Sequence, residues 1–170
     1  MEMSFEEKTF NTIETKLGTF ELNEKYECLI GSILWLGNDV SVFLKAEDIY
    51  ERDYHYGAFD YLFPLLKNQK QKDFEFRKFA SQKLTSLANH WRDDEVEPIE
   101  ISEENFANRI SITSIKLDYN GIYAIYFNDD GMFSGYQVMV YGNPEHDMVV
   151  ANMELDNWRE PLYPTYWGDL

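Results

Sequence analysis

Three histidines are the first residues to consider for chemistry, because an imidazole can bind a metal or move a proton near neutral pH. His55, His90 and His146 lie in three separate segments, without the close pairs that typify metal-ligand motifs. Residues 128–131 (Asn-Asp-Asp-Gly) resemble part of a calcium loop, but alternating oxygen donors and a terminal bidentate glutamate are missing. Turn formation explains this run better. We therefore expect no metal and no cofactor.

The possible nucleophiles lack the neighbours that covalent catalysis needs. Ser134 lies in Phe-Ser-Gly, which is not the Gly-x-Ser-x-Gly pattern of a nucleophile elbow. Cys28, the only cysteine, lies in an apolar run and is more typical of a small buried side chain than of a reactive thiol. Its pairing with His90 has no local motif to support it. We expect a protein that is not an enzyme; a hydrolase with paired carboxylates is the less favoured alternative.

Acidic residues dominate the composition. The chain has 31 Asp and Glu against 15 Lys and Arg, a formal net charge of -16. Such a charge repels nucleic acid and anionic membranes and speeds encounter with basic proteins. The densest run follows Arg92 and contains Asp93, Asp94, Glu95, Glu97, Glu100, Glu103 and Glu104. It is either an exposed loop leading into a capped helix or an anionic docking edge.

The hydrophobic period divides the chain into strand-rich ends and a helical middle. Residues 16–22, 27–36 and 39–44 predict an N-terminal meander, with a bulge near Gly31. Residues 49–67 predict an irregular or two-piece helix. Apolar side chains spaced by three and four predict a clearer helix over 74–91, with Asp73 as its N-cap. Ser102 is expected to cap a further short helix.

The C-terminal part predicts four consecutive antiparallel strands, 112–117, 122–127, 133–141 and 147–155. Asn-Gly and Asp-Gly pairs mark the first two turns. The strand 122–127 is apolar on both faces, so we expect it to be central, between a helix layer and the N-terminal meander. The predicted fold class is α+β: an antiparallel sheet, made of this four-strand meander and the N-terminal meander, packed against two or three helices.

Length and composition predict a single domain spanning residues 1–170. Residues 1–12 are expected to be partly ordered. The segment 156–170 is an aromatic tail that either docks on the domain or binds a partner; its aromatics are Trp158, Tyr163, Tyr166 and Trp167. The acidic N-terminus has no secretory hydrophobic region, and no apolar run reaches the ~20 residues of a membrane span. We expect a cytoplasmic protein.

A resemblance to a known family rests on residues 84–142. Residues 84–91 (Leu-Thr-Ser-Leu-Ala-Asn-His-Trp), the acidic linker, Asn105-Phe106, residues 126–136 and Val140-Tyr141-Gly142 resemble an uncharacterised bacterial family of small acidic cytosolic proteins. Its signature is an Asp-Gly hairpin followed by Phe-Trp-Gly-His, a strand, and a Gly-Asn or Gly-Asp turn. Ser134 and Tyr136 stand at the Trp and His positions. The resemblance implies an immunity protein, because such proteins are often encoded near secreted or contact-delivered toxins.

The leading hypothesis is therefore a non-enzymatic cytosolic protein that neutralises a basic toxin by covering its surface. The carboxylates of residues 93–104, with Asp129 and Asp130, would occupy the site of an anionic substrate. Trp91, Phe133 and Tyr136 would supply desolvated anchors, since charges at an interface rim mainly set association rate and selectivity. The alternative is a small-ligand-binding or regulatory domain with a pocket between helix 74–91 and the sheet.

Overall fold

The structure is a computed structural model that describes residues 11–154. These residues form eight strands, three α-helices and one 3-10 helix. The strands are β1 (Thr12–Thr15), β2 (Gly18–Asn23), β3 (Cys28–Trp35), β4 (Asn38–Lys45), β5 (Ile112–Asp118), β6 (Tyr123–Phe127), β7 (Gln137–Asn143) and β8 (Asp147–Glu154). The helices are η1 (Arg52–His55), α1 (Tyr56–Lys67), α2 (Gln69–Trp91) and α3 (Glu103–Arg109).

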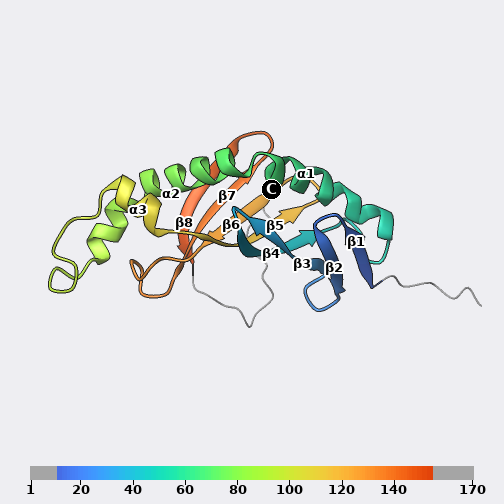
Figure 1. Ribbon diagram of the computed structural model, residues 1–170, viewed down its shortest axis with the longest axis horizontal. Coiled ribbons are helices and arrows are strands. Elements are labelled where there is room, and N and C mark those ends of the chain that lie inside the picture. The colour runs from blue at the N-terminus through green and yellow to red at the C-terminus, as the bar shows by residue number, and fades with distance from the viewer. Residues whose placement is uncertain (1–10, 155–170) are drawn as a thin grey trace, which may run out of the picture.

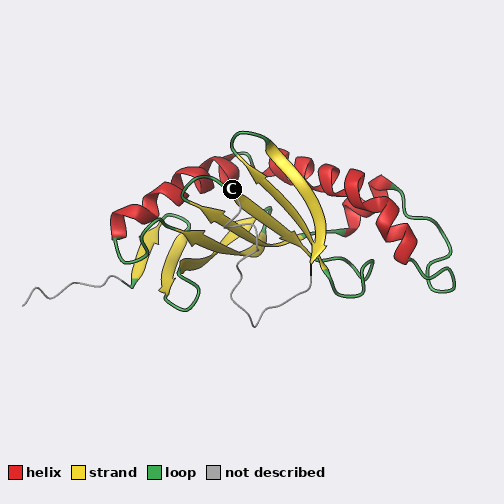
Figure 2. Ribbon diagram, turned by 180° about the vertical axis from the view of Figure 1, so that it is seen from behind, coloured by secondary structure: helices red, strands yellow, loops and turns green. Residues whose placement is uncertain are grey.

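The described strands form one sheet in sequence order, β1 to β8. All neighbouring strands are antiparallel except β4 and β5, which pair in parallel from Ser41 opposite Ser114 to Lys45 opposite Asp118. The helices form the crossover between these two strands and lie along one face of the sheet (Figure 1; Figure 2). The predicted α+β class is confirmed. The expectation that the N-terminal meander covers a face of the central strand is wrong, because the meander extends the same sheet edge to edge.

The central strand β6 is buried along its whole length, as its apolar pattern predicts. Tyr123, Ile125 and Phe127 belong to the main core, which also holds α2 side chains such as Phe76 and Leu84. On the other face of the sheet, a second cluster combines Ala124, Tyr126, Met139 and Tyr141. Alternate side chains of one strand thus serve two different apolar clusters.

Asp73 is not the N-cap of the long helix, because α2 begins at Gln69 and Asp73 lies inside it. Its buried carboxylate accepts hydrogen bonds from Trp35 Nε1 at 3.0 Å and from Arg77 Nε at 2.6 Å. Arg77 also donates to the backbone oxygens of Ala107 and Ile110. Asp73 therefore connects α2 to β3, and through Arg77 it connects α2 to the α3 region. From the sequence alone, a polar residue with this role cannot be distinguished from a helix N-cap.

The predicted bulge near Gly31 is also wrong, since the pairing of β3 with β4 continues unbroken through Gly31. The glycine has a packing role instead. A Cβ atom here would lie 2.5 Å from the ring of Phe20, which is fully buried. Glycine is needed because the Phe20 ring occupies the space that a side chain would take.

Other elements follow the predictions with shifted boundaries. The segment 49–67 is in two pieces, as predicted, and the break lies between η1 and α1 at Tyr56. Residues 16–22, predicted as one strand of the meander, contain the turn between β1 and β2 and most of β2. Ser102 caps α3 as expected, with its Oγ accepting from the Asn105 backbone at 3.0 Å.

Strand β7 begins only at Gln137, so residues 128–136 form a nine-residue connection where the sequence predicts a short turn. Its two arms are antiparallel neighbours, as expected. Within residues 11–154, no helix is both long and apolar enough to span a bilayer. The predicted aromatic tail 156–170 lies outside the described residues.

Candidate functional site

The acidic run forms a loop, residues 92–102, that joins α2 to α3 at one end of the elongated molecule (left in Figure 1). Its carboxylates are mostly in contact with solvent: Asp93, Asp94, Glu95 and Glu100 are exposed, and Glu97 is half-buried. Glu103 and Glu104 are exposed in the first turn of α3, where negative charge is favourable near the helix N-terminus. The predicted acidic residues therefore share one end of the protein.

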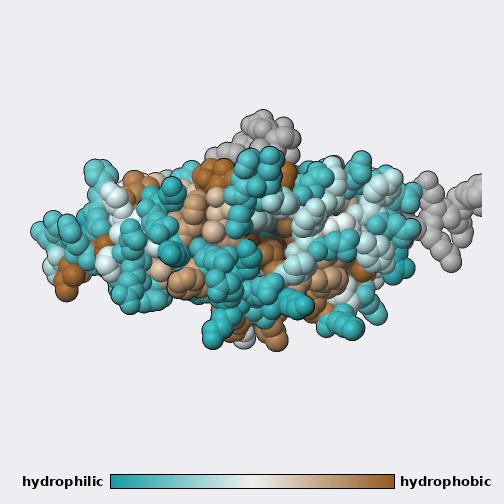
Figure 3. Space-filling view, turned by 90° about the horizontal axis from the view of Figure 1, so that it is seen from above, coloured by the Kyte–Doolittle hydropathy of each residue, from teal (hydrophilic) through white to brown (hydrophobic). Residues whose placement is uncertain are grey.

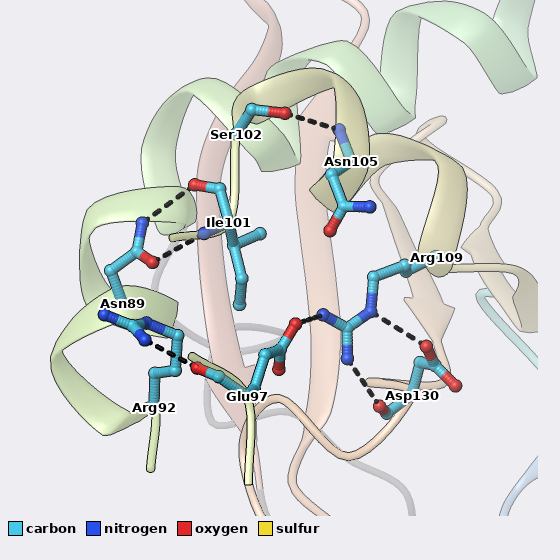
Figure 4. Close-up of polar contacts among 8 residues, drawn as sticks. All are labelled: Asn89, Arg92, Glu97, Ile101, Ser102, Asn105, Arg109 and Asp130. Carbon is cyan, nitrogen blue, oxygen red and sulfur yellow. Dashed lines mark hydrogen bonds and ion pairs between the residues drawn. The ribbon is translucent and has the colours of Figure 1, made fainter. Parts of the chain in front are cut away.

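The loop is fastened at its C-terminal end to α2. The Asn89 amide nitrogen donates to the Ile101 carbonyl, and the Asn89 amide oxygen accepts from the Ile101 N–H, both at 2.8 Å (Figure 4). The Ile101 side chain is itself buried in the main core. Arg92 donates from Nη1 to the Glu97 carbonyl at 2.6 Å. These hydrogen bonds hold the loop backbone in place at residues 97 and 101.

Arg109 joins the loop to the hairpin connection 128–136. Its Nη1 donates to Glu97 at 2.5 Å, its Nε donates to the Asp130 carboxylate at 2.9 Å, and its Nη2 donates to the Asp130 carbonyl at 3.1 Å (Figure 4). Burial by itself lowers the pKa of Arg109, but the hydrogen bonds to Asp130 and Glu97 outweigh this and raise it. The guanidinium stays charged and holds two carboxylates, 33 residues apart in sequence, beside each other.

The two aspartates of the hairpin connection have different roles. Asp130 keeps 56% of its side chain exposed beside Arg109. In contrast, the Asp129 carboxylate accepts hydrogen bonds from the backbone N–H groups of Phe133 and Gly135, at 2.8 and 3.1 Å. Asp129 therefore shapes the connection, whereas Asp130 adds negative charge to the surface formed by the acidic loop.

The three predicted aromatic anchors do come together next to the loop. Trp91 packs edge-on against Phe133 and Tyr136, with ring centroids 6.1 and 5.6 Å apart. Phe133 also contacts Phe106 of α3 and is fully buried. Only Trp91, which is 39% exposed, and the half-buried Tyr136 retain accessible surface. Phe133 therefore supports the other two rings and offers no surface to a partner.

Sequence reasoning missed two apolar side chains on this loop. Val96 is 81% exposed and Ile99 is 79% exposed, the highest values among the large hydrophobic side chains of residues 11–154. At this end of the molecule, Figure 3 shows hydrophobic side chains surrounded by hydrophilic ones. The signal that could have found them is their position within a run of carboxylates, where an apolar side chain has no strand or helix to bury it. Val96, Ile99 and the carboxylates around them are called the acidic tip below.

The remaining candidates for chemistry are far apart or occupied. His55 is buried, and its Nε2 lies 2.8 Å from the Ile49 carbonyl, whereas His90 and His146 are exposed on separate elements. In the part of the chain that the structure describes, no three His, Cys, Asp or Glu side chains are grouped as a metal site requires. Burial raises the pKa of the Cys28 thiol to about 12, so it carries almost no thiolate near neutral pH.

Fold and site together define an α+β protein with a helix layer on one face of an open sheet and a fixed, charged loop at one end. The chain belongs to a family described as uncharacterized protein conserved in bacteria (DUF2262), whose family model matches residues 14–153. The predicted resemblance to an uncharacterised bacterial family is thereby confirmed. No curated protein and no solved structure matches the chain.

Proposed function

We propose that this protein is a non-enzymatic protein-binding protein whose acidic tip docks on a basic partner. The partner we propose is a toxin domain that the protein neutralises in the cytoplasm. The immunity role is the one implied by the resemblance of residues 84–142, and the charge of the chain indicates a basic surface as its complement.

The observation that carries the proposal is the exposure of Val96 and Ile99 on a loop whose backbone is already held. A loop that is ordered before binding loses little conformational entropy on association, so more of its contact energy appears as affinity. Burying one such side chain in a partner's pocket is favourable by roughly 1.5 to 3 kcal/mol. The two side chains are therefore well suited to act as the apolar centre of an interface.

The surrounding carboxylates would act mainly on rate and selectivity. Exposed charges of one sign attract an oppositely charged surface over about 10 Å at 0.1 M salt, and this attraction weakens as salt is added. Asp93, Asp94 and Glu95 precede Val96, and Glu100 follows Ile99. This arrangement of acids around an apolar centre would occupy a basic groove that otherwise receives an anionic substrate.

The test is binding to the product of the neighbouring reading frame, measured by surface plasmon resonance, together with rescue of growth when that product is expressed. Replacing Val96 and Ile99 together with serine should weaken affinity by at least about 100-fold, chiefly through faster dissociation. Replacing Leu34 with serine is the matched control, because Leu34 is also exposed, at 64%, but lies on β3. It should leave affinity unchanged.

Charge reversal tests the role of the carboxylates separately from that of Val96 and Ile99. Changing Asp93, Asp94 and Glu95 to lysine should slow association strongly at low salt and much less at high salt. A cognate product that is itself strongly acidic, or one that binds both the serine and the lysine variants as tightly as the natural protein, would refute the proposal.

A further inference from the structure

A cleft of about 400 Å³ lies where α1 meets α2, over the turns that connect β5 to β6 and β7 to β8. In Figure 1 the β7–β8 turn rises beside the junction of the two helices. The volume is within the usual range of small-molecule sites. Because Phe76 on the cleft wall and Trp91 at the end of α2 are 15 residues apart, the cleft and the acidic tip are separated by about 22 Å or more along the helix axis. The cleft is therefore a separate site from the acidic tip.

The walls of the cleft are mainly apolar and aromatic. Tyr61 and Leu65 come from α1, Phe76 from α2, Leu117 from β5 and Tyr123 from β6. Phe76, Leu117 and Tyr123 are buried in the core, so one wall is fixed by the packing of the domain. Such walls suit a flat ring, which can stack on a tyrosine or phenylalanine.

Two glycines allow these walls to approach each other. At Gly121, which has a φ of +82°, a Cβ atom would lie 2.6 Å from both the Tyr61 ring and Pro144. At Gly142, a Cβ atom would lie 2.3 Å from the Tyr123 hydroxyl oxygen. Any larger residue at these two positions would push the cleft walls or the tyrosine hydroxyl out of place.

Polar groups converge at one end of the cleft. The Tyr123 hydroxyl donates to the Asp147 carboxylate at 2.9 Å, and burial raises the pKa of Tyr123, so the hydroxyl remains a donor. Lys72 Nζ lies 3.8 Å from Asp147 but only 3.1 Å from Glu75. Glu75 lies just outside the cleft wall, but together with Asp147 it outnumbers the one ammonium group, and the Asp147 side chain is 55% exposed. This end of the cleft therefore has a net negative charge and can accept further hydrogen bonds.

We propose that the cleft binds a small molecule that combines an aromatic ring with a primary ammonium group. The ring lies between the Tyr61 side and the Phe76 side of the cleft, and the ammonium donates to Asp147. Tyrosine rings beside the carboxylate add cation–π attraction. A carboxylate or phosphate head is disfavoured by Asp147 and Glu75 and by the formal charge of -16 of the whole chain. The proposal is independent of the acidic tip and of its partner.

The probe is 2-phenylethylamine, titrated into the ¹⁵N-labelled full chain and followed by amide shifts in NMR spectra. Saturable shifts are expected at Gly121 and Asn143, and 3-phenylpropionate, with the opposite charge on a similar ring, should produce none. Asp147→Asn should weaken binding of the amine about tenfold, because a charged acceptor becomes neutral. Asparagine is tolerated at the positive φ of 55° found here, so the turn is preserved.

Two further variants show whether a change in affinity comes from the bound ammonium group or from general damage to the turn. Lys72→Gln should tighten amine binding several-fold, because it removes the positive charge that competes for Asp147. Glu145→Gln removes a charge from the same turn outside the cleft and should leave affinity within about twofold of the natural protein. Opposite effects of the Lys72 and Asp147 variants are not expected from loss of structure.

The proposal would be overturned by the absence of saturable shifts up to about 10 mM amine. Equal binding of 3-phenylpropionate would also overturn it, as would an unchanged affinity in Asp147→Asn. Shifts confined to residues 92–105 would place the amine at the acidic tip, which contradicts the proposal as well. None of these results changes the expectation for toxin binding, since that experiment uses different residues and a protein ligand.

Discussion

Replacing Asn89 with alanine tests whether the acidic tip is held in one conformation before a partner arrives. The Asn89 side chain forms two 2.8 Å hydrogen bonds with the backbone of Ile101, and both are partly buried. Each such bond contributes about 1 kcal/mol net to stability. Since alanine removes both, we expect the free energy of unfolding to fall by about 2 kcal/mol.

The same substitution should also make local opening of the loop more frequent. A loss of about 2 kcal/mol corresponds to about 30-fold faster hydrogen exchange, because 1.4 kcal/mol is a factor of ten. We expect this acceleration at the Ile101 amide, whose N–H is the one that donates to Asn89. Amides in the centre of the sheet, such as that of Ile125, exchange through global unfolding and should accelerate by about 30-fold at most, so the Ile101 amide is the one that tests the loop.

The assays are urea unfolding for global stability and NMR-detected hydrogen exchange for local opening. The control is Asn105→Ala, which removes an exposed amide from α3, close to the same loop. If the Ile101 amide exchanges equally fast in Asn89→Ala and in the natural protein, Asn89 does not fasten the loop. The argument for a preorganised binding surface would then fail.

Three more outcomes are expected. Asp73→Ala should lower the free energy of unfolding by about 3 kcal/mol in urea melts, because Trp35 Nε1 and Arg77 lose their shared acceptor. Cys28, with its pKa raised to about 12, should react with a disulfide reagent at pH 8 at least 100-fold more slowly in the native than in the urea-unfolded protein. Burial lowers the pKa of His55 in the folded state. As pH falls below 6.5, the imidazole therefore takes up a proton in the unfolded state before it does so in the folded state. Natural protein should therefore lose stability relative to His55→Gln as pH falls through this range, measured by urea melts at pH 7.5 and pH 5.

Each of these outcomes has a result that contradicts it. Glu75→Ala removes an acid from an i,i+3 pair on the surface of the same helix and should cost at most about 1 kcal/mol. A similar cost for Asp73→Ala would mean that its carboxylate is not part of a buried network. Equal thiol reactivity in native and unfolded protein would contradict the burial of Cys28. A constant stability difference between natural protein and His55→Gln would contradict the lowered pKa.

Local patterns were sufficient for much of the fold. The apolar side chains on both faces of residues 122–127 correctly predicted a central strand, because only a strand covered on both faces can bury both sets. The Ser102 cap was found because the hydroxyl acts on a backbone N–H three residues away. The resemblance of residues 84–142 identified the kind of family correctly. In the first two cases the pattern or the interaction is contained within a short stretch of chain, and the family resemblance is a property of the sequence itself.

Contacts between distant residues were decided only by the tertiary structure. Trp35 and Asp73 are 38 residues apart, and nothing near either one indicates the other, so the sequence by itself predicts a helix cap at Asp73. The parallel pairing of β4 with β5 depends on how three helices cross over the sheet. The exposure of Val96 has the same origin, since burial depends on what the rest of the chain places nearby. The hydrophobic period and the composition show whether a side chain is apolar or charged. Which residues that side chain contacts depends on long-range packing.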